Sequence, residues 1–135
     1  MHRRVQPPDV FEPVKGLYTQ VVAVAEGPRY EIAGTLPYHL DGSLDEPLAV
    51  QAQVVMDNLE RSLASVGLRR SDIVRIQVYT TRMDEFLGTA LDTVFGWFGE
   101  DRPASTLVEV SRLANPRVLV EIDASAVGSP VRAAE

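Results

Sequence analysis

The sequence predicts one α+β domain in which two helices cover one face of a mixed β-sheet. The 135 residues fit a single domain, since most domains contain about 100 to 150 residues. Segments with the two-residue period of strands are interspersed with segments that show the helical period of 3.6 residues. These segments follow the order ββαβαββ, which is typical of helices packed on one sheet.

The N-terminal part is predicted to form an arm and two strands. Residues 1–15 carry three prolines and no sustained period, which indicates an extended arm before a domain that spans residues 16–127. Residues 17–25 and 30–36 are rich in residues that suit a pleated sheet, and the turn Glu26-Gly27-Pro28 predicts that they form a hairpin. Gly34, inside the second run, indicates a bulge or a close approach to the backbone.

Two amphipathic helices are predicted in the middle of the chain. The first begins after Asp45, a predicted N-cap, and continues to about Val66, where Gly67 offers a stop. The second begins at Asp84 and ends at Gly99. Each helix has an apolar stripe at helical spacing, formed by Leu48, Ala52, Val55, Leu59, Leu63 and Val66 in the first and by Leu87, Ala90, Leu91, Val94, Phe95 and Phe98 in the second.

The remaining strands are predicted by alternation. Residues 71–81 alternate apolar and polar side chains, and residues 102–127 contain two more β-type runs joined at Ala114-Asn115-Pro116. In the last run one face is apolar throughout, with Val118, Val120, Ile122, Ala124 and Ala126, while the other face carries Leu119, Glu121 and Asp123. Because the helices cover one side of the sheet, the second face is expected to meet water or another subunit. Residues 128–135 are predicted to be a small-residue tail.

Glu121 is the first candidate for a functional residue, because it places a carboxylate in mid-strand beside apolar residues. If that face is covered, an unpaired charge would be strongly unfavourable, so Glu121 needs a partner, a water network, a raised pKa or a ligand. A purely structural carboxylate in a buried hydrogen-bond network is the competing interpretation.

Composition narrows the functional classes. The formal net charge of -6 gives no general attraction to nucleic acid or anionic lipid. The absence of cysteine excludes disulfides and thiolate chemistry, and the two histidines, His2 and His39, argue against a histidine metal site or a serine triad. No apolar run approaches the roughly 20 residues of a membrane helix and no secretory signal is visible, so we expect a cytoplasmic protein. We also expect the protein to use neither a metal nor a cofactor.

Six phrases of the sequence are more specific together, in their order and spacing, than any one of them is alone. They are Gly16-Leu17-Tyr18-Thr19-Gln20, Ala33-Gly34, Asn58-Leu59, Val78-Tyr79-Thr80-Thr81-Arg82-Met83-Asp84-Glu85-Phe86, Val108-Glu109-Val110-Ser111-Arg112-Leu113 and Val120-Glu121-Ile122-Asp123-Ala124. In this order and spacing, the phrases resemble the Rid family, the YjgF-like reactive intermediate deaminases that are also known as L-PSP endoribonucleases.

The resemblance implies a chorismate-mutase-like fold and a homotrimer with small-molecule clefts between subunits. Members of the family hydrolyse imines or enamines of amino acids, using an arginine on the fifth strand for the substrate carboxylate and a glutamate on the sixth for water. Glu121 matches that glutamate, but Ser105 stands where the arginine is expected. Ala33 and Ala90 stand where the family has serine and asparagine, so this chain departs from the pattern at three positions of the pocket.

The resulting prediction is a Rid-like homotrimer that binds a small metabolite and hydrolyses an imine or enamine. Glu121 is the predicted catalytic residue, and the predicted substrate-binding residues are Tyr18, Ala33, Gly34, Arg102, Ser105 and Thr106. Arg102, three positions before Ser105, is a candidate for the missing cation. A non-catalytic ligand-binding or chaperone-like trimer is the alternative. Endoribonuclease activity is a third hypothesis, which the excess of acidic over basic side chains disfavours.

Overall fold

The computed structural model describes residues 2–128, so the predicted tail lies outside the described residues except for Gly128. The strands are β1 (Arg3–Val5), β2 (Val21–Ala23), β3 (Arg29–Thr35), β4 (Ile73–Thr80), β5 (Ala104–Glu109) and β6 (Val120–Val127). The helices are α1 (Leu48–Ser65), α2 (Met83–Thr89) and α3 (Leu91–Phe95), and short 3-10 turns occupy Val14–Gly16, Arg70–Asp72 and Gly96–Phe98.

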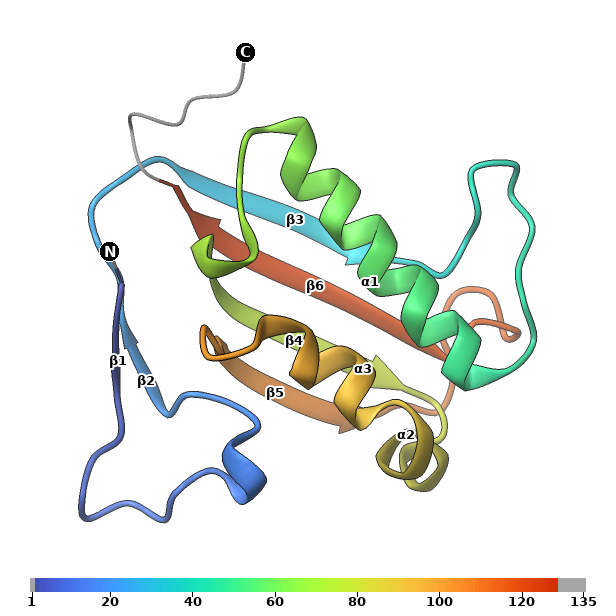
Figure 1. Cartoon of the computed structure of the whole chain (residues 1–135). Helices are drawn as coiled ribbons and strands as arrows, with labels where there is room; N and C mark the ends of the chain where they lie inside the picture. The colour runs from blue at the N-terminus through green and yellow to red at the C-terminus, as the bar shows by residue number, and fades with distance from the viewer. Residues whose placement is uncertain (1, 129–135) are drawn as a thin grey trace.

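Four strands form the main sheet in the order β3-β6-β4-β5, and all three helices lie on one of its faces (Figure 1). Strand β6 is antiparallel to both neighbours, whereas β4 and β5 run parallel. The predicted α+β architecture with a mixed sheet is therefore confirmed, with three helices in place of two.

The predicted hairpin between residues 17–25 and 30–36 is wrong. Strand β2 is only three residues long and pairs with β1, which comes from the predicted arm, while β3 pairs with β6. The two-stranded β1–β2 sheet lies beside the main sheet (Figure 1). Sequence neighbours usually pair, but β6 offers β3 a longer partner with a continuous apolar face, and this long-range pairing prevails.

The predicted second helix is broken at Ala90. Its φ of -123° and ψ of -10° lie outside the helical region, so the chain turns there and restarts as α3. The predicted apolar stripe is largely buried, but Leu87 remains 48% exposed. No proline marks the break, which is why the spacing of apolar residues alone suggested one continuous helix.

The first helix and the β6 face agree closely with the sequence. Gly67 has a φ of 73° and ends α1 as predicted, although Pro47 rather than Asp45 is the N-cap residue. The apolar faces of α1 and β6 together form the centre of the core. Leu119, predicted to lie on the uncovered face, is instead only 6% exposed and packs in this core, because it precedes β6 and does not follow its alternation.

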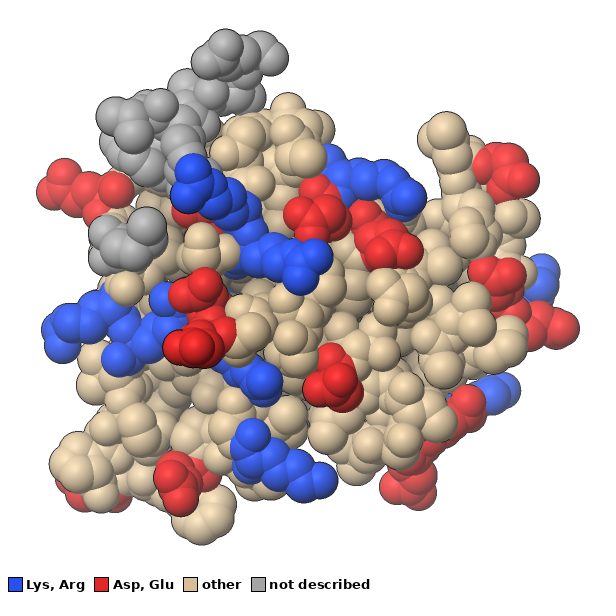
Figure 2. All heavy atoms as spheres, viewed as in Figure 1, with Lys and Arg blue, Asp and Glu red and all other residues tan. Residues whose placement is uncertain are grey.

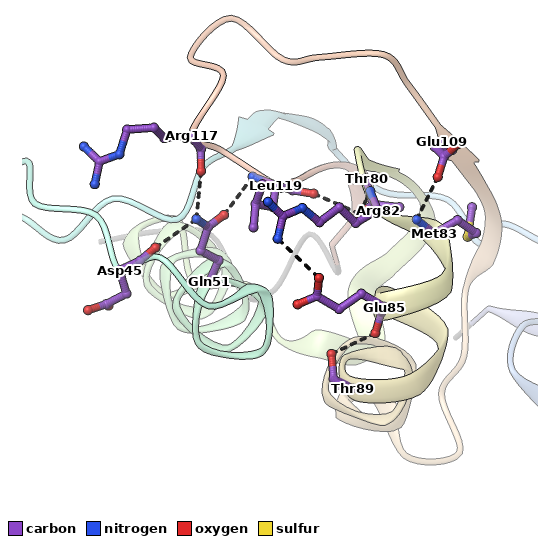
Figure 3. Close-up of polar contacts among 10 residues, drawn as sticks. All are labelled: Asp45, Gln51, Thr80, Arg82, Met83, Glu85, Thr89, Glu109, Arg117 and Leu119. Carbon is purple, nitrogen blue, oxygen red and sulfur yellow. Dashed lines mark hydrogen bonds and ion pairs between the residues drawn. The ribbon is translucent and has the colours of Figure 1, made fainter.

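One buried polar side chain ties α1 to two loops. Gln51, with no exposed surface, donates hydrogen bonds from Nε2 to the carbonyls of Asp45 (2.8 Å) and Arg117 (2.9 Å). Its Oε1 accepts a hydrogen bond from the Leu119 N–H at 2.8 Å (Figure 3). Gln51 thereby fixes the point at which the chain enters β6, the strand that carries Glu121.

Candidate functional site

The face of the main sheet opposite the helices carries polar side chains from three strands. Residues directly opposite one another in neighbouring strands point to the same side. Tyr79 lies opposite Glu121, and Gln77 lies opposite Asp123 on one side and Thr106 on the other. These five residues, exposed or half-buried, define the open face of the sheet, and no helix of residues 2–128 covers it.

Glu121 rests against the backbone of Gly34 on β3. A Cβ atom added at Gly34 would overlap Glu121 Oε2 and would lie 2.9 Å from Cδ and 3.2 Å from Cγ. The pairing of β3 with β6 also shifts between Ile32 and Thr35, so Gly34 lies in an irregular stretch of the strand. Both predictions for this glycine, a bulge and a close approach, are therefore correct. The missing side chain of Gly34 makes the space in which the Glu121 carboxylate lies.

Partial burial raises the pKa of Glu121 above that of an ordinary glutamate, and the negative charge of Asp123 adds to the effect. A raised pKa means that ionisation is harder in the folded protein than in the unfolded chain. Any stability that Glu121 contributes is therefore present at low pH and is lost as the pH rises through its folded pKa. A carboxyl group with a raised pKa on an open face is a candidate functional group.

Tyr79 is a member of the open face that the sequence patterns did not single out. Burial and the charge of Asp123 raise the pKa of its phenol, which therefore stays protonated, and its hydroxyl donates to Gln77 Oε1. Tyrosine at an alternating strand position is common, so its spacing gave no sign of a functional role. Only the register of β4 against β6 reveals that it is the direct neighbour of Glu121.

Ser105 and Thr106 lie on opposite faces of β5. Ser105 is opposite Ile76, which is fully buried beneath the helices, whereas Thr106 belongs to the open face and accepts a hydrogen bond from Arg75 at 2.8 Å. Ala33 lies on the exposed side of β3, next to Gly34. Of the predicted substrate-binding residues, the structure thus brings Gly34 to Glu121 and places Thr106 two strands away, while Ser105 points to the other side of the sheet.

Arg102 lines a second region, a surface hollow of about 400 Å³ beside the start of β5. We call this hollow the β5-edge pocket; the residues that line it include Lys15, Leu17, Leu87, Leu91, Asp92 and Arg102. Tyr18 lines another hollow, of about 390 Å³, whose lining includes Arg4 and Val5 of β1 and also Lys15, which thus borders both hollows. The hydrogen bonds from Thr19 to the carbonyls of Arg102 and Pro103 hold the segment that carries Tyr18 against β5.

Within one chain, therefore, Glu121 and Arg102 do not share a pocket. Glu121 faces away from the helices, and the β5-edge pocket is lined in part by α2 and α3, which cover the other face. Glu121 lies on β6, and β4 lies between β6 and β5, so two inter-strand steps of about 4.8 Å each separate Glu121 from β5. In the described part of one chain, these two candidate residues thus lie in separate regions.

No group of three or more histidine, aspartate or glutamate side chains that could hold a metal ion occurs in residues 2–128. In the same part of the chain, no helix combines the length and apolar character needed to span a membrane.

Comparison with known proteins assigns the family. A small mixed sheet with helices on one face and a glutamate on its open face is the arrangement expected of a Rid-type protein. The chain belongs to the Endoribonuclease L-PSP family, whose model matches residues 12–128. The predicted membership in the Rid, or YjgF-like, family and the predicted chorismate-mutase-like fold are thereby confirmed.

Individual relatives agree with this assignment. A RutC family protein of Pyrococcus horikoshii is 34% identical over 116 residues, which cover 82% of this chain and 86% of the relative. The 2-iminobutanoate/2-iminopropanoate deaminase of Escherichia coli K12 is 34% identical over 89 residues, covering 64% of this chain and 68% of the enzyme. The crystal structure of a Rid family protein of unknown function from Yersinia pestis matches with a TM-score of 0.87 at 27% identity, covering 94% of this chain and 98% of that one.

Proposed function

We propose that the protein is a cytoplasmic homotrimer that hydrolyses an imine or enamine derived from an amino acid in clefts between its subunits. The observation that carries the proposal is the Glu121 carboxylate, which rests on Gly34 on an uncovered sheet face with its pKa raised. A carboxylate whose pKa lies closer to neutral can both accept and return a proton. The similarity to an imine deaminase supports the reaction type.

In the proposed reaction, Glu121 accepts a proton from water as the water oxygen bonds to the imine carbon. The electron pair of the C=N bond moves to nitrogen, which gains a proton from solvent and gives a carbinolamine. Glu121 then returns its proton to the nitrogen, the C–N bond breaks with release of ammonia, and the hydroxyl group loses its proton to solvent as the carbonyl forms. The net change is imine plus water to carbonyl compound plus ammonia, and an enamine first gains a proton at carbon to become the imine.

The separation of Glu121 from Arg102 within one chain supports a cleft between subunits. In a cyclic trimer the open face of one subunit can meet the β5 edge of its neighbour, so Glu121 from one chain and Arg102 from another would border one cleft. Arg102 would then hold the substrate carboxylate in place of the arginine that Ser105 replaces. A guanidinium suits this role because it stays charged and can make paired hydrogen bonds to a carboxylate.

Ammonia release from freshly generated 2-aminoacrylate, 2-iminopropanoate and 2-iminobutanoate tests the proposal. Glu121→Ala should lower the catalysed rate by about a hundredfold or more, the usual size of a general acid–base contribution. In the wild type the rate should fall as the pH drops through the raised pKa of Glu121, because protonation removes the base. Glu31→Ala is the matched control: Glu31 lies on the same sheet face, and hydrogen bonds from Ser125 and Arg29 lower its pKa.

A second candidate function is ligand binding without catalysis. It is favoured by the identity of Ser105, because a neutral hydroxyl at the position of the expected arginine cannot supply the positive charge that pairs with a substrate carboxylate. Saturable binding of a small metabolite with no acceleration of any imine hydrolysis would support this alternative and overturn the enzymatic proposal. Ribonuclease action has less support, since acidic and basic side chains are interspersed on the visible face and form no uniformly basic surface (Figure 2).

A further inference from the structure

The β5-edge pocket contains two cations, and neither is engaged by a carboxylate within residues 2–128. Arg102 donates its Nε–H to the Gly99 carbonyl at 3.0 Å, and no ion pair engages its terminal nitrogens there. Lys15 makes no hydrogen bond or ion pair in the described part of the chain, and it is the only lysine in the sequence. Both positive charges are therefore available to an anionic group in the pocket.

The backbone holds both cations in defined positions. The Arg102 carbonyl accepts hydrogen bonds from Arg4 Nε at 3.1 Å and from Thr19 Oγ1, which fixes the start of β5. Lys15 has a φ of 54°, a left-handed conformation that residues other than glycine adopt at a cost. In the part of the chain described here it is the one non-glycine residue with positive φ. Lys15 lines the β5-edge pocket from the 3-10 turn Val14–Gly16, and it also borders the neighbouring hollow that Tyr18 lines.

The rest of the pocket adds one negative charge and an apolar wall. Asp92 bends back over Gly96, where an added Cβ would lie only 2.5 Å from Asp92 Oδ1, so its carboxylate has a defined place on α3. Leu17, Leu87 and Leu91 supply the apolar surface, and Leu87 is 48% exposed and therefore accessible to a ligand. Two cations, one carboxylate and three leucines are complementary to a zwitterion with an aliphatic side chain.

We propose that Lys15 and Asp92 are specificity-determining residues of the β5-edge pocket. Lys15 acts with Arg102 on the carboxylate of an amino acid, or of an imino acid derived from it, and Asp92 contacts the protonated nitrogen. The leucines cover an aliphatic side chain, and the volume of about 400 Å³ suits a ligand of this size. The proposal rests on the proposed function for the reaction, but the binding it describes can be measured without any turnover.

Three probes with the same branched carbon chain separate the contributions of the carboxylate and the ammonium group to binding. L-leucine carries both charges, 4-methylpentanoate keeps only the carboxylate, and 3-methylbutylamine keeps only the ammonium group. Affinities are measured by titration for the wild type and for Lys15→Met, Arg102→Met and Asp92→Asn. Arg61→Met, on the exposed surface of α1 outside the pocket, controls for the change in net charge.

We expect L-leucine to bind more tightly than either single-charge probe. Loss of Lys15 or Arg102 should weaken L-leucine and 4-methylpentanoate by about fivefold, the effect of losing one partly exposed charge contact. The same losses should leave 3-methylbutylamine unchanged. Asp92→Asn should show the reverse pattern, weakening L-leucine and 3-methylbutylamine but not 4-methylpentanoate, and Arg61→Met should change none of them.

Because the sequence has a single lysine, labelling Lys15 shows directly whether the ligand binds beside it. Reductive ¹³C-methylation keeps the charge of Lys15 and gives one side-chain signal besides that of the terminal amine. L-leucine should shift this signal with the same saturation curve as the titration. An unmoved Lys15 signal at saturation, or equal affinities in all the variants, would overturn the proposal. If the variants change the three affinities as expected but no imine is hydrolysed, the proposed reaction is wrong and the proposed binding site is still supported.

Discussion

Replacing Gly34 with alanine is expected to abolish hydrolysis that depends on Glu121 while the protein stays folded. The new Cβ would overlap the Glu121 carboxylate and force it out of its place. The obstructing atoms are the far end of a flexible side chain, and the φ of Gly34 is not positive, so the backbone can accept alanine. We expect the rate to fall by about a hundredfold, as for Glu121→Ala, because the general base is displaced. Stability should change by less than about 1 kcal/mol.

A double-mutant cycle makes this prediction specific. In the Glu121→Ala background, Gly34→Ala should cause no further loss of rate, because the group that it displaces is already absent. Adding Glu121→Asp to the Gly34→Ala variant should recover part of the lost rate, since the shorter aspartate side chain leaves room for the added methyl group. Independent losses that multiply, or a Gly34→Ala protein with the wild-type rate, would show that Gly34 does not position Glu121.

Replacing Gln51 with leucine is expected to lower the free energy of unfolding by about 3 kcal/mol, because the hydrogen-bond partners of Gln51 would be left unpaired. Leucine fills a similar volume, so packing alone predicts little change. The variant leaves the Asp45 and Arg117 carbonyls and the buried Leu119 N–H without their partner (Figure 3). Because these groups set the entry into β6, Gln51→Leu should also weaken whatever activity Glu121 supports.

Gln53→Leu is the matched control for this prediction. Gln53 lies two residues further along α1 on its exposed side, where its one hydrogen bond, to Asp57 at 3.0 Å, is open to water. Its replacement should change stability by no more than about 0.5 kcal/mol. Urea denaturation of both variants, with equal dependence on urea concentration, provides the comparison. Similar unfolding midpoints for the two variants would mean that the buried network contributes little.

Sequence patterns predicted the parts of the fold that are determined locally. The alternation in β4 and β6 and the stripe of α1 follow directly from which residues are buried, so these elements agree with their predicted positions. Gly34 was identified for the right reason, because a glycine inside a strand usually marks a bulge or a close approach of another part of the chain. Pairings between distant segments were not accessible in this way, and the hairpin of β2 with β3 was wrong for that reason.

The candidate site was predicted only in part, because it depends on strand register. Glu121 stood out as a carboxylate in mid-strand, but its neighbour Tyr79 appears only when β4 is aligned with β6. Ser105 was chosen by its position in a family phrase, and its direction away from the open face required the pairing of β5 with β4. Gln51 was not among the predicted residues, although its place three residues after Leu48, on the apolar side of the helix, is a signal for a buried and hydrogen-bonded side chain.

Hybrid trimers test directly whether Glu121 of one subunit and Arg102 of its neighbour form one active site. Glu121→Ala chains, expected to be nearly inactive alone, and Arg102→Met chains, expected to keep about a fifth of the wild-type rate below substrate saturation, are co-expressed with different affinity tags. In randomly mixed trimers each hybrid has one intact site, so the mixture should show roughly a quarter of the wild-type rate of imine hydrolysis. Purified hybrids that release ammonia no faster than the two parent variants would contradict the claim.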